Sequence, residues 1–172
     1  MSIELTGHER TFANDQVIVS KTDTKGRIVY ANRVFLGIGE LTQREALGAP
    51  HNLIRHPHMP RTIFKLLWER ITSGREIFAY VLNRAMNGDH YWVFAHVTPS
   101  ISVSGEINGY HSNRRTADRG KITTVIKPLY DELLAIEQQP SNRKDGLTNA
   151  YEFLHDRLKN KGVDYEIGRA HV

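Results

Sequence analysis

Three strand-like stretches follow one another in the middle of the chain, with short polar turns between them. Residues 76–85 and 90–101 are rich in β-branched and aromatic side chains, and Asn87-Gly88 stands between them. An Asn-Gly pair in this position is a strong signal for a tight β-hairpin turn. Residues 106–114 form the third stretch. Consecutive strands with such short connections run antiparallel, so this region predicts an antiparallel sheet.

Two further strands and two helical segments precede the hairpin. Residues 16–24 and 27–31 have strand character, and Gly26 supplies the unrestricted backbone that the connection between them needs. Apolar residues recur with helical spacing in 33–47 and again in 61–73, where they form one face. This order predicts an α+β domain whose five-stranded antiparallel sheet carries helices on one face.

Local signals set the ends of the helical segments. Thr42 and Glu45 have the spacing of a capping box, in which a hydroxyl and a carboxylate satisfy the first N–H groups of a helix. The polar, histidine-rich segment 51–60 contains Pro57 and Pro60, which preclude a regular helix across it. We therefore expect a loop between the two helical segments.

The last third of the chain returns to helical spacing. Residues 118–137 place their apolar side chains on one side, and Pro128 is expected to kink this helix or to start a new one. A second amphipathic helix is predicted over 143–161. We expect 118–166 to be a helical C-terminal extension. Residues 167–172 resemble the translation of a sequencing adapter and are expected to be a non-native tail.

Charge and composition narrow the classes of partner. The net charge is +4, but the basic residues are scattered among acids, so we expect no nucleic-acid binding. No apolar run approaches the roughly 20 residues that cross a bilayer, and the N-terminal residues lack the order of a signal peptide. We therefore expect a cytoplasmic protein without direct membrane insertion.

Residue types also bear on chemistry. The chain has no cysteine, which excludes disulfides, thiolate zinc sites and cysteine adducts. Nine histidines are present, but none has the spacing of a HExxH or three-histidine zinc site. No Ser/His/Asp or paired-carboxylate constellation is visible either. We predict neither a metal site nor an enzyme.

Several motifs together resemble a known family. Residues 23–32 (DTKGRIVYAN) look like the opening of a PAS domain. Residues 48–60 (GAPHNLIRHPHMP), Trp68 and residues 83–93 (NRAMNGDHYWV) are similar to the PAS domains of bacterial aerotaxis receptors. The resemblance implies a PAS sensor domain over 1–117, including an N-terminal cap, that binds FAD noncovalently and reports its redox state to a chemotaxis signalling module.

The resemblance carries over to individual positions. Two of them depart from the family pattern, because His58 stands where Asp is usual and Ile77 where Trp is common. The positions that match residues implicated in flavin binding or sensing are Asn32, Arg55, His56, Phe64, Trp68 and Asn83.

Each of these residues also has an ordinary structural explanation. Asn83 could serve the pyrimidine edge of a flavin with one amide, or be satisfied by backbone. Arg55 could pair with a pyrophosphate or form a surface salt bridge. Phe64 and Trp68, at i and i+4, could wall the ring or pack in the core. Asn32 could contact the cofactor or cap a helix.

The remaining candidates are weighed in the same way. His56 and His58 could bind the cofactor, cap a helix or lie in solvent. Strand alternation predicts that Tyr91 faces the pocket together with Asn83, whereas Trp92 points to the opposite face. There, Trp92 could pack under an N-terminal segment or a partner.

The sequence thus predicts a cytoplasmic redox or oxygen sensor for energy taxis. FAD is expected ahead of FMN or haem, and the expected partner is a separate chemoreceptor or other signalling protein, with a homodimer also open. One alternative is a haem-PAS gas sensor, for which His90, His96 and His111 are the candidate ligands. The other is a cofactor-free PAS interaction module. In the redox sensor, the helices at 118–161 are expected to serve output or docking.

Overall fold

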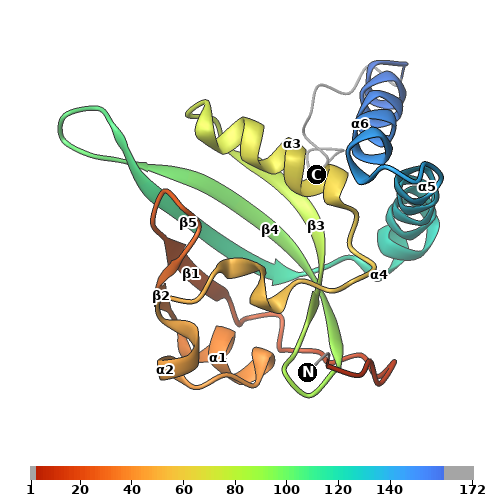
Figure 1. Cartoon of the computed structure of the whole chain (residues 1–172). Helices are drawn as coiled ribbons and strands as arrows, with labels where there is room; N and C mark the ends of the chain where they lie inside the picture. The colour runs from red at the N-terminus through yellow and green to blue at the C-terminus, as the bar shows by residue number, and fades with distance from the viewer. Residues whose placement is uncertain (1–2, 161–172) are drawn as a thin grey trace.

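The computed structural model describes residues 3–160 and contains one five-stranded antiparallel sheet (Figure 1). Its strands lie in the order β2-β1-β5-β4-β3, so the last strand pairs with the first and the central hairpin occupies one edge. The predicted α+β class and strand number are confirmed. The strands are β1 (Ile18–Thr22), β2 (Ile28–Ala31), β3 (Ile77–Arg84), β4 (His90–Ile101) and β5 (Ile107–Thr116).

Both predicted hairpins form, and each turn has a local cause. In the first, the Asp23 carboxylate accepts hydrogen bonds from the backbone N–H groups of Lys25 and Arg27, both at 2.9 Å. In the second, Gly88 has a φ of 96°, a conformation that favours glycine. A Cβ at Gly88 would lie 1.9 Å from the Glu4 carbonyl oxygen. The N-terminal segment therefore packs directly on this turn.

Four short helical elements connect β2 to β3 and cover one face of the sheet (Figure 1). The helical segment predicted over 33–47 is two helices, because Glu40 adopts a left-handed conformation (φ 53°) that ends the first. Thr42 and Glu45 form the predicted capping box at the start of the second. The elements are α1 (Arg33–Gly39), α2 (Gln43–Ala46), the 3-10 helix η1 (His51–Ile54) and α3 (Arg61–Thr72).

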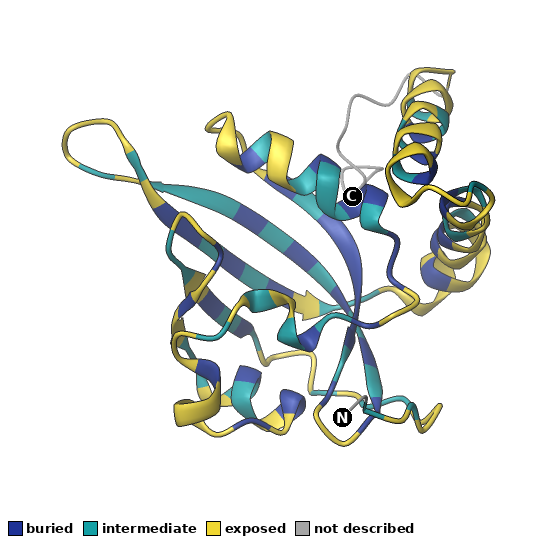
Figure 2. Ribbon diagram, viewed as in Figure 1, coloured by how far each residue is buried: buried dark blue, intermediate teal, exposed yellow. Residues whose placement is uncertain are grey.

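Burial alternates along most of β4, as the sequence predicts (Figure 2), whereas β3 is buried almost throughout. Asn83 and Tyr91 are paired across β3 and β4, and both are buried. Trp92 points to the opposite face, where it lines a small recess together with Phe12 and Ile122. The predicted strand parity is confirmed, and Trp92 shares its recess with Phe12 of the N-terminal segment.

The C-terminal extension folds back as a pair of helices beside α3 (Figure 1). The Lys127 N–H donates to the Ile122 carbonyl five residues back, so the interruption predicted at Pro128 is a π-helical turn followed by a new helix. Residues 161–166 of the predicted extension and the tail 167–172 lie outside the described residues. The elements are α4 (Arg119–Lys121), the π-helical turn η2 (Ile122–Ile126), α5 (Lys127–Gln138) and α6 (Arg143–Asn160).

Candidate functional site

A cavity of about 250 Å³ lies between α3 and the helix-covered face of the sheet. One wall consists of Phe64, Leu67 and Trp68 on α3, and the opposite wall of Val81, Ala95 and Val97 on the sheet. The rings of Trp68 and Tyr110 meet edge to face, with centroids 5.4 Å apart. Two opposed apolar walls suit a planar aromatic ligand.

The cavity also holds buried polar atoms that lack a partner. Asn83 Nδ2, Ser112 Oγ and Arg114 Nη1 are buried and make no hydrogen bond within the described part of the chain. All three residues line the cavity. A buried polar atom left unpaired costs roughly 1–3 kcal/mol. A ligand with acceptor atoms along one edge would remove that cost.

Arg114 and His51 form the polar centre of the cavity. Arg114 donates through Nη2 to Ser20 Oγ and to His51 Nε2, each at 2.7 Å. Burial lowers the pKa of His51 to about 3, and the positive charge of Arg114 acts in the same direction. Burial also lowers the pKa of Arg114 to about 10. Among residues 3–160, no carboxylate lies within 4 Å of this guanidinium.

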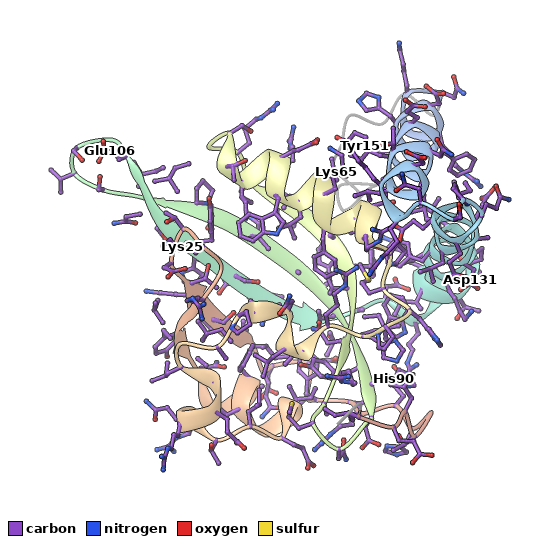
Figure 3. All side chains as sticks on the ribbon, in the orientation of Figure 1. Lys25, Lys65, His90, Glu106, Asp131 and Tyr151 are labelled. Atoms are coloured by element: carbon purple, nitrogen blue, oxygen red, sulfur yellow. The ribbon has the colours of Figure 1, made fainter. Side chains whose placement is uncertain are left out.

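Arg55 lies at the side of the cavity, where its half-buried guanidinium stacks over the Phe64 ring at 4.4 Å from the centroid. Its Nη2 donates to the Met59 carbonyl at 3.1 Å. Burial lowers the pKa of Arg55, and the negative charge of Glu137 opposes that shift. Lys25 also reaches the cavity, from the turn between β1 and β2 (Figure 3). Two cationic groups therefore lie where a ligand could extend a phosphate.

The structure brings four of the eight predicted site residues together. Arg55, Phe64, Trp68 and Asn83 line the cavity, and the strand pairing places Asn83 opposite the backbone of Arg55. The other four, Asn32, His56, His58 and Tyr91, do not line it.

The residues outside the lining have other contacts. Asn32 Oδ1 accepts from the Phe35 and Val19 N–H groups, and Nδ2 donates to the Val17 carbonyl. Its amide thus caps α1 and joins it to β1, which is the structural alternative considered for this residue. The Asn32 carbonyl oxygen therefore cannot accept a hydrogen bond from a flavin ring unless one of these two bonds breaks.

Two predicted histidines lie together beside the cavity rather than in it. His56 is buried, and its Nδ1 accepts the His58 N–H at 3.0 Å. Burial lowers the pKa of His56 to about 4, helped by His58 and His90. His58 itself is exposed. This hydrogen bond holds the loop before α3 and involves no contact with a ligand.

Tyr91 is fully buried. Its hydroxyl makes no hydrogen bond within the described residues, and burial raises its pKa to about 12. The side chain is buried, as the strand alternation predicts, but it is not part of the cavity lining.

Sequence reasoning missed Arg114, His51 and Ser112. The available signal was strand parity, because Tyr110, Ser112 and Arg114 alternate along β5 with the same inward direction. Parity alone could not tell that this face of β5 lines a cavity.

The three histidines considered for haem do not line the cavity. His96 Nε2 lies 2.6 Å from Glu76 Oε2, and His111 Nε2 lies 3.0 Å from Asn113 Oδ1. Residues 3–160 contain no group of three or more His, Asp or Glu placed to hold a metal ion. The same residues include no helix that is long and apolar enough to cross a membrane.

Residues 12–111, more than half of the chain, match the protein family described as PAS fold. The chain belongs to the PAS fold family. The matched residues end within β5, before the helices that follow it.

The PAS domain is similar to two groups of curated proteins. It is 38% identical to the aerotaxis receptor of Escherichia coli (strain K12) over 131 residues, which are 76% of this chain and 26% of the receptor. It is 26% identical to the nitrogen fixation regulatory protein of Klebsiella pneumoniae over 99 residues, 58% of this chain and 20% of that protein. The chain therefore spans about a quarter or less of the length of these relatives.

Solved structures show the same fold. The light-state structure of the blue-light photoreceptor Aureochrome1 LOV has a TM-score of 0.58 at 23% identity, over 64% of this chain and 89% of that chain. The light-state dimer of the fungal blue-light photoreceptor Vivid has a TM-score of 0.51 at 19% identity, over 60% of this chain and 80% of that chain. At these identities the likeness concerns the fold of the PAS domain.

Proposed function

We propose that this PAS domain is a redox sensor that holds FAD noncovalently in the cavity and signals to a separate chemoreceptor or related transducer. The observation that carries the proposal is the set of unpaired buried atoms on Asn83, Ser112 and Arg114, in a cavity that α3 and the sheet line with apolar side chains. The similarity to an aerotaxis receptor supports the same class of function.

The donors in the cavity match the chemistry of an isoalloxazine ring. The pyrimidine part of that ring offers carbonyl oxygens, which the Asn83 amide and the Arg114 guanidinium could satisfy. Phe64 and Trp68 would contact the apolar part of the ring. The Arg55 guanidinium is the residue that would favour a pyrophosphate, and hence FAD over riboflavin.

A bound flavin supplies reversible gain of electrons and protons, which changes the acceptor atoms of its ring into donors or charges. Asn83 can answer such a change, because rotating its amide exchanges a donor for an acceptor. Arg114 can only donate, so it favours the state in which the ring edge is more negative. Because the Asn83 amide can rotate and Arg114 can only donate, a change in the redox state of the flavin can be converted into a movement of the Asn83 side chain.

The proposed sensor carries out no catalysis of its own and acts in the cytoplasm, alone or as a homodimer. Its output passes to another protein. The absence of cysteine separates it from sensors that work through a covalent thiol adduct, although the fold is that of solved blue-light photoreceptors.

An absorption spectrum of freshly purified protein tests the proposal, followed by acid release and chromatography of the bound cofactor. We expect flavin absorption and release of FAD. A Soret band would instead identify a haem sensor. Colourless protein, even after expression with excess riboflavin, would identify a cofactor-free interaction module and overturn the proposal.

A further inference from the structure

The N-terminus of α3 is capped by a residue from a distant helix. Pro60, at the N-cap position, offers no side-chain hydrogen bond. Instead Glu137 Oε1, near the end of α5, accepts from the Thr62 backbone N–H at 2.8 Å and from Thr62 Oγ1 at 2.7 Å. Glu137 Oε2 lies 3.3 Å from Arg61 Nε. A buried carboxylate thus satisfies the start of the helix that forms one wall of the cavity.

The same helix α5 also holds the opposite wall. The Tyr130 hydroxyl donates to the Tyr80 carbonyl at 2.6 Å, and both side chains are buried. Tyr80 precedes Val81, which lines the cavity from β3. One face of α5 therefore contacts α3 through Glu137 and β3 through Tyr130, and these two elements enclose the ligand space between them.

Helix α6 clamps α5 against α3. A Cβ at Gly146 would lie 2.2 Å from the Glu137 carbonyl oxygen, so the two helices meet at this glycine. Arg61 Nη2 donates to the Arg143 carbonyl at 2.7 Å. On the outer side of α3, Lys65 lies over the Tyr151 ring at 4.3 Å, and the two side chains face one another (Figure 3). Helix α3 is thus packed between the cavity and the C-terminal hairpin.

We infer that the α5–α6 hairpin is a latch on the cofactor cavity, held by the Glu137 carboxylate, and that its docking is coupled to cofactor binding. The inference rests on the proposed function. Glu137 is a positioning residue, because it acts on the ligand space through α3. A ligand between α3 and β3 stabilises the relative placement of these two elements, and the docked hairpin contacts both of them in that same placement.

Coupling of this kind is reciprocal, so a docked hairpin tightens cofactor binding by the factor by which the cofactor tightens docking. Losing the Glu137 charge weakens two hydrogen bonds and one half-buried ion pair. If most of that loss reaches the cavity, FAD binding weakens by roughly threefold to thirtyfold.

Two measurements on the whole chain test the latch. The first is hydrogen exchange of the α6 backbone, with and without saturating FAD, in the unmodified protein. The second is FAD affinity of Glu137→Gln, compared with Asp131→Asn as a matched control. Asp131 lies on the exposed side of the same helix, where it pairs with Lys127 (Figure 3).

We expect FAD to slow exchange in α6 by at least the factor by which Glu137→Gln weakens FAD binding, while Asp131→Asn binds as the parent does. Gly146→Ala, which forces α6 off α5, should weaken FAD binding in the same direction. Bound FAD that leaves α6 exchange unchanged, or Glu137→Gln with the affinity of its control, would overturn the latch alone. A parent protein that takes up no flavin would overturn the proposed function as well, which separates the two failures.

Discussion

Arg114 Nη2 lies 2.7 Å from His51 Nε2, and a guanidinium can only donate a hydrogen bond. His51 must therefore accept at Nε2, which leaves its ring neutral with the proton on Nδ1. Protonation would place two positive charges together in a buried site. The charge at the polar centre of the cavity therefore depends on pH through the protonation of His51.

The stability of the protein should fall as His51 is forced to take up a proton. The pKa of His51 is lowered from 6.5 to about 3, so between these values the unfolded chain binds a proton that the folded chain does not. The contribution is complete above pH 6.5 and is lost progressively as the pH falls towards 3. From pH 6.5 to about pH 5 the loss from this group is about 2 kcal/mol.

Denaturant unfolding at several pH values would measure this loss. His51→Gln, which cannot titrate, should remove about 2 kcal/mol of the fall in unfolding free energy over that interval. His58→Gln, at an exposed position between η1 and α3, is the control and should keep the loss that His51 causes. Equal slopes for the parent and His51→Gln would show that His51 is not held neutral.

Asn83→Ala should weaken flavin binding by about 1–3 kcal/mol, or roughly tenfold to hundredfold. Asn83 Nδ2 has no partner within the described residues, so its removal should cost the cofactor-free protein little stability. Quenching of flavin fluorescence on titration gives the affinity. Trp92→Phe, which keeps an aromatic ring beside Tyr130 on the opposite face of the sheet, is the matched control, and its flavin content should stay near that of the parent. A larger loss in the control than in Asn83→Ala would refute a ring contact.

Arg55→Ala should reduce the affinity for FAD more than the affinity for riboflavin, which has no phosphate. The reason is that a guanidinium can pair with both oxygens of a phosphate group. Arg55 also stacks on Phe64, so a loss common to all flavins would report on the cavity wall instead. Titrations with riboflavin, FMN and FAD at two salt concentrations separate these effects, with Arg55→Lys as the variant that keeps the charge. Equal losses for riboflavin and FAD would exclude the phosphate role.

Blue light should produce no covalent flavin adduct in this protein. The chain has no cysteine to supply the thiol, so photoreduction by a nearby Trp or Tyr is the largest effect expected. Absorption spectra before and after illumination, without added reductant, provide the measurement. Reversible bleaching with the spectrum of a thiol adduct would contradict the prediction.

The features that the sequence predicts correctly have local causes. The Asn87-Gly88 turn, the Thr42–Glu45 capping box and the opposite directions of Asn83 and Trp92 each depend on residues a few positions apart. The capping box indicates where α2 starts, but the end of α1 carries no such signal, because Glu40 adopts a left-handed conformation that is uncommon for a residue with a side chain.

The parts of the site that sequence reasoning missed depend on distant contacts. His51 and Arg114 are 63 positions apart, and Thr62 and Glu137 are 75 positions apart. Nothing in the local pattern distinguishes Arg114 from a solvated strand arginine, or Glu137 from one more acidic residue on an amphipathic helix. Asn32 is the opposite case, since a residue that matches the family pattern has an amide whose carbonyl oxygen already accepts hydrogen bonds from α1 and β1.

The π-helical turn η2 also sets the rotational phase of everything after it. Such a turn holds one residue more than an α-helical turn, and each residue of a helix rotates the chain by about 100°. Tyr130, Leu133 and Glu137 lie on one buried face of α5 with this extra residue in place. A one-residue deletion within 122–126 would leave their chemistry intact and yet turn all three away from their partners. The number of residues in η2 therefore decides whether the hairpin faces its partners on α3 and β3, although η2 itself does not line the cavity.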